Sequence, residues 1–177
     1  VAARSNTPDH VTADKMAERF ASMGVNIIRL HAADGPIGDE PGSWSSCREA
    51  PLIDYESGSS RKFHKEGLDR FDYFAAKLKE KGIYLHIDLI VSREFMEADE
   101  LGYPGGAPSC IKRHAMYNER LAELQKEYAK ELLCHVNPYT GLALIDDPAV
   151  VTVQINNEDS AIKWPMEADA GEQMKPY

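Results

Sequence analysis

The stretch "AVVTVQINNED", residues 149–159, is an apolar run that ends abruptly in amide and carboxylate side chains. Its β-branched residues predict a strand over residues 149–155. Two adjacent asparagines are ordinary turn residues, but a glutamate beside an amide at the end of a buried strand also suits a catalytic acid. The rest of the chain has to decide between a plain turn and a functional strand end.

Helical and extended patterns alternate along the 177 residues. Thr12 is expected to be the N-cap of the first helix, and Gly24 and Gly82 are expected to end the first and second helices. The expected helices cover residues 13–23, about 66–81 and about 112–135, and the expected strands cover residues 25–31, 83–91 and 149–155. The expected apolar stripe of the third helix is Tyr117, Leu121, Leu124, Tyr128 and Leu132. Nearly continuous apolar strands are typical of parallel sheets, so the sequence predicts an α/β fold.

The connections that follow the first two strands are long, covering residues 32–65 and 92–109. Segments in this position carry the functional sites of many α/β folds. They contain Trp44, Tyr55 and Tyr103 among Gly, Pro and Ser, a mixture suited to stacking against sugar rings. The same aromatic residues would also serve to pin long loops to the body of the protein, and the sequence leaves both interpretations open.

Polar side chains occur toward the ends of all three expected strands. Alternate residues of a strand share one face, which groups Arg29 with His31, Tyr84 with His86 and Asp88, and Thr152 with Gln154 and Asn156. Asn157 and Glu158 follow directly after the third group. Because the carboxyl ends of parallel strands meet at one edge, these side chains are expected to converge as at the active face of a β/α barrel.

Three segments carry a family resemblance: "FASMGVNIIRLH" (residues 20–31), "LDRFDYFAAKLKEKGIYLHIDL" (68–89) and "DDPAVVTVQINNED" (146–159). In this order and spacing they resemble the clan A glycoside hydrolases, especially family 5 and its mannanase-like relatives. The resemblance extends from about residue 12 to about residue 165. It implies a (β/α)8 barrel of the TIM type and the hydrolysis of O-glycosidic bonds in a poly- or oligosaccharide.

The resemblance also implies roles for individual residues. Glu158 falls on the general acid/base, Asn157 on the amide that binds the sugar 2-hydroxyl, and Arg29 on the arginine beside the nucleophile. An acid is needed because a glycosidic oxygen leaves poorly unless it is protonated. The further substrate-binding residues are expected to be His31, His86, Asp88 and Trp44.

The chain departs from the family pattern at two positions. Ile90 stands where the family often has a histidine, two residues after the aspartate of the third strand, and Asp159 replaces a proline after Asn-Glu. The resemblance therefore does not extend to a particular sugar or linkage.

A complete barrel has eight strands and about 250 residues, and this chain provides three expected strands. By resemblance they correspond to strands two to four, so residues 1–177 are expected to form a single partial barrel. The nucleophile of a retaining two-carboxylate mechanism would then lie outside the chain. We expect the isolated segment to be inactive, to expose an apolar inner face, and to need the remaining half of the barrel or self-association.

Charge and composition restrict the other function classes. The net charge of -9 argues against nucleic acid or an anionic membrane as a partner, and the sequence has no apolar run of the length that spans a membrane. No cofactor or metal is expected, although His31, His86, Asp88 and Glu158 leave open a metal-dependent barrel enzyme. A non-catalytic carbohydrate-binding or scaffold domain is the third alternative. The localisation is unknown from the residues, and the resemblance favours a secreted or periplasmic protein.

Overall fold

The computed structural model describes residues 2–3, 6–37, 50–103 and 111–158. Its sheet has four strands in the order β1-β2-β3-β4, and every neighbouring pair is parallel. The strands are β1 (Ala2–Ala3), β2 (Ile27–Leu30), β3 (Tyr84–Ile90) and β4 (Val150–Asn156). The three predicted strands are thus confirmed, adjacent in the predicted order. The two-residue β1 was not predicted from the sequence.

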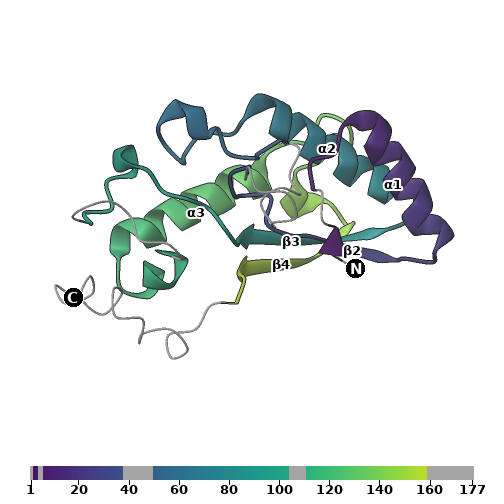
Figure 1. The fold of residues 1–177 in the computed structure, drawn as a ribbon. Coiled ribbons are helices and arrows are strands. Elements are labelled where there is room, and N and C mark those ends of the chain that lie inside the picture. The colour runs from purple at the N-terminus through teal and green to yellow at the C-terminus, as the bar shows by residue number, and fades with distance from the viewer. Residues whose placement is uncertain (1, 4–5, 38–49, 104–110, 159–177) are drawn as a thin grey trace.

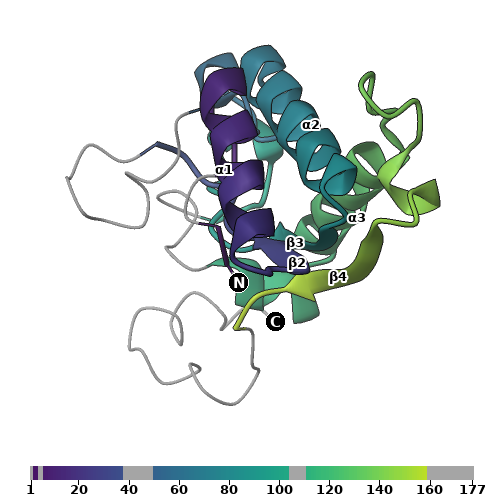
Figure 2. The same cartoon turned by 90° about the vertical axis from the view of Figure 1, so that its right-hand side faces the viewer.

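The helices are α1 (His10–Ser22), α2 (Lys65–Glu80) and α3 (Glu119–Cys134). Figures 1 and 2 show that all three lie over the same face of the sheet. Each helix connects one strand to the next parallel strand, which is the repeating unit of a β/α barrel. The described residues therefore form part of such a barrel, in agreement with the predicted fold class.

The helix starts correct two predictions. Asp9, not Thr12, is the N-cap of α1, because its carboxylate accepts hydrogen bonds from both the backbone N–H and the hydroxyl of Thr12. The predicted third helix is divided, since a short 3-10 helix at Ile111–Met116 precedes α3 and Asn118 caps α3 itself. Tyr117 lies in this break and is exposed, so it does not belong to the apolar stripe. The other four predicted stripe residues are buried.

The hydrophobic core lies between the helices and the sheet. Ile28 and Leu30 of β2 and Leu85, Ile87 and Leu89 of β3 face the helices and are buried. In α2 they meet a buried apolar face that includes Phe71, Phe74 and Leu78. The alternation of a strand then turns the intervening residues of β2 and β3 to the opposite, open face of the sheet.

The open face of the sheet is less apolar than the sequence led us to expect. The open face carries polar residues, because Arg29 is paired in register with His86, and His86 with Thr152. Tyr84 is exposed on this face, and a row of exposed apolar residues lies on the helix side of β4, where Val153 is in register with the buried Ile87. Val151, Val153 and Ile155 are 51%, 38% and 69% exposed. The outer side of β4 is therefore a row of exposed apolar side chains within the described part of the sheet.

Candidate active site

Arg29 connects the carboxyl-terminal ends of three strands. Its Nε lies 2.8 Å from Asp88 Oδ2 on β3, and its Nη2 donates to Gln154 Oε1 on β4 at 3.1 Å. The same Nη2 donates to Asn157 Oδ1, just beyond β4, at 2.6 Å. A guanidinium holds several acceptors in a fixed planar geometry, so Arg29 fixes these side chains relative to one another.

Asp88 is the buried centre of this arrangement, with no exposed side-chain surface. Besides Arg29 it contacts His31, whose Nδ1 lies 2.5 Å from Asp88 Oδ2. His86 Nε2 is 3.2 Å from Asp88 Oδ1 but is not oriented for a hydrogen bond, and this buried nitrogen has no hydrogen-bond partner among the described residues. Because Asp88 is enclosed by these three side chains, it is placed to orient them rather than to reach a ligand itself.

Asn157 is held through both its backbone and its side chain. Its backbone N–H donates to the carbonyl of Ile90, the last residue of β3, at 2.9 Å. Its side-chain oxygen accepts from Arg29, which has only donor groups, so the oxygen and not the nitrogen of the amide must face the guanidinium. The NH2 group of Asn157 therefore points away from Arg29, where it can donate to another acceptor.

Glu158 follows at the end of β4 and is exposed. Its φ of 47° lies in the left-handed region, which side chains other than Gly, Asn and Asp rarely adopt. Such a conformation costs of the order of 1 kcal/mol or more, and Ala32 and Glu100 adopt it as well. The stretch that opened the sequence analysis is thus the strand β4 followed by a bend at Asn157 and Glu158, and the bend places the glutamate directly beside the fixed Asn157.

The structure brings most of the site residues predicted from the sequence together, but not all of them. The structure brings together Arg29, His31, His86, Asp88 and Asn157, with Glu158 next to them in the chain. Trp44 lies outside the described residues. Gln154, which the sequence placed on the correct face without a role, joins the site through Arg29.

Tyr55 and Tyr103 both make hydrogen bonds that pin the long loops. Tyr55 Oη donates to the carbonyl of Asp34 at 2.6 Å and accepts from the backbone N–H of Glu94 at 3.2 Å. Burial raises the pKa of Tyr55, which keeps its hydroxyl protonated. Tyr103 Oη lies 2.8 Å from His114 Nδ1. For these two aromatics the pinning interpretation accounts for the observed contacts.

The sequence interpretation gave no structural role to the buried charged residues in the loops. Asp34 binds the backbone just after β3, and Asp99 accepts hydrogen bonds from the N–H groups of Ser60 and Met96. Arg93 donates to the carbonyl and hydroxyl oxygens of Ser60, and burial lowers the pKa of its guanidinium. Burial of loop charges follows no periodic pattern in the sequence, so no local signal identified them.

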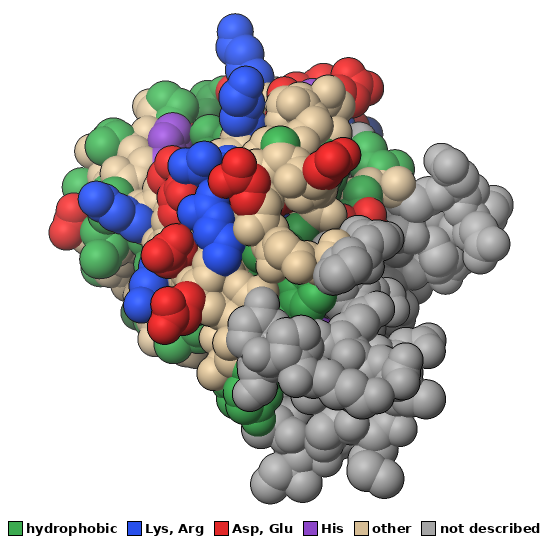
Figure 3. Space-filling model, turned by 90° about the vertical axis from the view of Figure 1, so that its left-hand side faces the viewer, with side chains coloured by type: hydrophobic (Ala, Val, Ile, Leu, Met, Phe, Trp, Pro, Cys, Tyr) green, Lys and Arg blue, Asp and Glu red, His purple; other side chains and the backbone are tan. Residues whose placement is uncertain are grey.

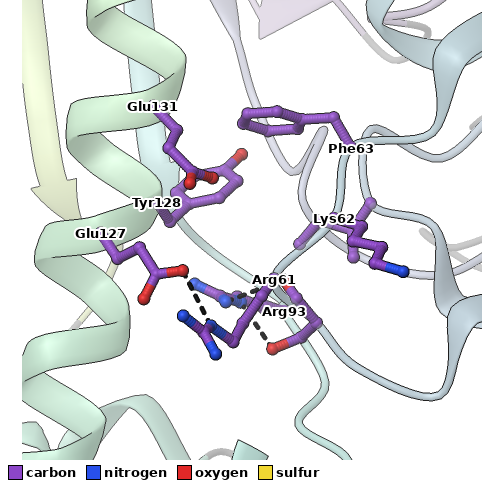
Figure 4. A pocket seen from close by; sticks show the side chains of 9 residues that line it. Arg61, Lys62, Phe63, Arg93, Glu127, Tyr128 and Glu131 are labelled. Carbon is purple, nitrogen blue, oxygen red and sulfur yellow. Dashed lines mark hydrogen bonds and ion pairs between the residues drawn. The ribbon is translucent and has the colours of Figure 1, made fainter.

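Arg93 also lies beneath a small hollow between α3 and the segment before α2, shown in Figure 4. Arg61 Nε donates to Glu127 Oε1 across this hollow at 2.8 Å, with Tyr128 and Glu131 beside them. The ion pair connects α3 to the segment before α2. The hollow contains charges of both signs and lies apart from the residues that Arg29 joins.

The alternative of a metal site finds no support in the part of the chain that the structure describes. There, no group of three or more His, Cys, Asp or Glu side chains is placed to hold a metal ion. The guanidinium of Arg29 occupies the side of Asp88 that a cation would need, and two positive charges there would repel each other.

Within the same residues, no helix is long and apolar enough to cross a membrane.

Figure 3 looks onto the face where the strands end, and there Lys and Arg are interspersed with Asp and Glu among the described residues. The fold and the polar strand ends together define a partial β/α barrel with its candidate site at the carboxyl ends of the strands. This is the face on which barrel enzymes carry their active sites.

Comparison with solved structures relates this partial barrel to mannan-degrading enzymes. The endo-β-1,4-mannanase of Thermotoga petrophila is similar with a TM-score of 0.59 and 25% identity, over 86% of this chain and 32% of the mannanase. An endo-1,4-β-mannanase of Rhizomucor miehei gives a TM-score of 0.59 at 19% identity, over 86% of this chain and 41% of that enzyme. A family 5 mannosidase of R. miehei gives 0.55 at 14% identity, over 83% and 38%.

These similarities establish the glycosidase-like barrel fold, and the chain spans about a third to two fifths of the length of each of these enzymes. No protein-family model matches the sequence, and no curated protein matches it at a significant level.

Proposed function

We propose that this chain forms part of the catalytic barrel of a retaining glycoside hydrolase, with β-1,4-linked mannan as the first substrate class to test. The observation that carries the proposal is the hydrogen bond from Arg29 to Asn157, which fixes the residue beside Glu158 at the end of β4. The family resemblance of "DDPAVVTVQINNED" supports it. The mannanases among the structural neighbours support the choice of substrate.

In this proposal Glu158 protonates the leaving glycosidic oxygen and later activates the hydrolytic water. A carboxyl group is most effective in this role when it is partly desolvated, and Glu158 is exposed in the free chain. The bound sugar would cover it and supply that desolvation. Asn157 would donate from the NH2 group that faces away from Arg29 to the sugar 2-hydroxyl, while Arg29 is held in place by Asp88.

The second carboxylate is proposed to come from outside this chain. A retaining enzyme places its nucleophile about 5–5.5 Å from the acid, on the other side of the anomeric carbon. Asp88 and Asp34 are both buried and bound by neighbouring groups, so neither is available for attack. The remaining part of the barrel would supply the nucleophile and complete the sheet.

The test is to replace Glu158 with Gln in the longer enzyme that contains this chain. Hydrolysis of manno-oligosaccharides should fall by a factor of the order of 100 or more, because their leaving groups need protonation. Aryl mannosides with activated leaving groups should be affected much less in the first step. The matched control is Glu97→Gln, which changes an exposed glutamate of the long loop after β3 and should alter neither rate.

Equal rates for Glu158→Gln and the parent on both substrate types would exclude Glu158 as the acid. Binding of manno-oligosaccharides without any hydrolysis by the longer protein would instead favour the non-catalytic carbohydrate-binding alternative. The isolated 177-residue chain should release no sugar above background, since Asp34 and Asp88 are held by neighbouring groups and the nucleophile is proposed to come from outside the chain.

A further inference from the structure

Asp34 lies four residues after the end of β2 and is almost fully buried, with 1% of its surface exposed. Its Oδ2 accepts hydrogen bonds from three consecutive backbone N–H groups, those of Val91 at 2.8 Å, Ser92 at 3.1 Å and Arg93 at 2.9 Å. Bonds from backbone N–H groups to an ionised carboxylate are among the stronger hydrogen bonds in proteins. Asp34 therefore determines the direction in which the chain leaves β3.

The strand end that Asp34 fixes is also the support of the candidate acid. Val91 directly follows Ile90, and the carbonyl of Ile90 accepts the backbone N–H of Asn157 at 2.9 Å. Asn157 is bonded in turn to Glu158 through the peptide chain. A continuous path of short contacts therefore connects the Asp34 carboxylate to the candidate acid, through the exit of β3 and the turn after β4.

The backbone around Asp34 is itself fixed by hydrogen bonds. Its carbonyl accepts the hydroxyl of Tyr55 at 2.6 Å, and the preceding carbonyl of Ala33 accepts the backbone N–H of Leu52 at 3.1 Å. Tyr55 also accepts the N–H of Glu94, so it contacts both loops that Asp34 joins. The loop after β2 thus brings a fixed negative charge to the end of the neighbouring strand.

We propose that Asp34 is a positioning residue, which sets the location of Glu158 by fixing the exit of β3. The inference rests on the proposed function for its catalytic consequence. Acid catalysis depends steeply on placement, and a displacement of about 1 Å can cost a factor of about 100. Asp34 does not contact the substrate in this proposal, so its loss should lower kcat and leave KM unchanged.

The variant Asp34→Asn tests the proposal, because it keeps the size of the side chain but removes the charge and one acceptor. In the longer enzyme we expect kcat for manno-oligosaccharides to fall by a factor of about 10 to 100. Activated aryl substrates, which need no protonation, should lose less than about 3-fold. Equal losses on both substrates would show that Asp34 acts only through general stability, and would overturn the proposal.

Asp99→Asn is the matched control. Asp99 is also fully buried and also accepts hydrogen bonds from loop N–H groups, but it reaches the exit of β3 only indirectly, through Ser60 and the side chain of Arg93. It should reduce stability without separating the two substrate types. If Asp34→Asn fails to fold, Tyr55→Phe provides the milder variant, since it removes only the hydroxyl that holds the Asp34 backbone and should shift the rates in the same direction.

A second measurement separates this inference from the proposed function. In the 177-residue chain itself, hydrogen exchange at the amides of Ser92, Arg93 and Asn157 should become faster in Asp34→Asn. Asp99→Asn should leave the Asn157 amide unchanged. Unaltered exchange at Asn157 in Asp34→Asn would overturn the coupling even if the enzyme is a glycosidase, and faster exchange would establish the coupling even if no sugar is cleaved.

Discussion

The guanidinium of Arg29 donates a 2.6 Å hydrogen bond to the side-chain oxygen of Asn157, a residue 128 positions later in the sequence. This contact connects β2 directly to the residue that follows β4. The same guanidinium contacts Asp88 on the strand between them. One side chain thus joins three parallel strands at the edge where the candidate acid lies.

Arg29→Lys should destabilise the protein although it conserves the charge. Lysine cannot hold Asp88, Gln154 and Asn157 in one plane, and Asp88 is fully buried. We expect the free energy of unfolding to fall by roughly 1–3 kcal/mol, measured by urea denaturation. Arg61→Lys is the control. Its partner Glu127 is partly exposed, so the decrease in the free energy of unfolding should be much smaller. Equal effects for the two variants would contradict the central position of Arg29.

Asp72 should make the stability of the protein depend on pH between about 4 and about 6. Burial raises its pKa from 3.8 to about 6, and the contact with His135 Nε2 at 2.7 Å only partly opposes this. Because the folded-state pKa is the higher one, the neutral form stabilises the fold below pH 4. That contribution is lost as the pH rises through 6.

The variant Asp72→Asn should remove this loss, since an amide stays neutral at every pH. We expect it to raise the free energy of unfolding at pH 7 by roughly 1–3 kcal/mol and to leave it nearly unchanged at pH 4. Asp9→Asn provides a contrast of opposite sign, because hydrogen bonds from Thr12 lower the pKa of Asp9. Denaturation curves at both pH values measure the difference, and a lower stability of Asp72→Asn at pH 7 would disprove the assignment.

Gly67→Ala should be destabilising, although alanine normally favours a helix over glycine. A Cβ at Gly67 would lie 1.8 Å from the backbone oxygen of Pro51, so α2 or the segment before it would have to move. We expect a loss of roughly 1–3 kcal/mol by thermal or urea unfolding instead of the usual gain of about 1 kcal/mol. The neighbouring exposed Glu66→Ala should change stability by less than about 0.5 kcal/mol. A stabilised Gly67→Ala would show that the contact is not tight.

Much of the fold could be predicted from the sequence because its signals are local. The apolar runs predicted β2, β3 and β4, and their shared polar ends predicted that Arg29, Asp88 and Asn157 would meet. Local patterns could not place the N-cap at Asp9 instead of Thr12, since both residue types are common caps. The catalytic role of Glu158 stays a prediction.

Other features depended on partners far along the chain. Asp34 has the sequence surroundings of an ordinary loop aspartate, and only the folded chain brings it to the amides after β3, more than 50 residues away. The expectation of an apolar inner face had a similar weakness. An apolar strand indicates that both of its faces are buried in the complete fold. It does not indicate which of the two faces is covered by residues of the same chain.

The outer face of β4 also has a consequence for handling the protein. The strand "VVTVQIN" contains no charge, proline or glycine, and it forms an end of the described sheet with Val151, Val153 and Ile155 exposed. These are the properties of segments that nucleate amyloid-like aggregates by adding strands from other molecules. Recovery of folded protein should therefore decrease as its concentration rises during refolding. A gatekeeper lysine in place of Val153 would interrupt the aggregating segment on its exposed side.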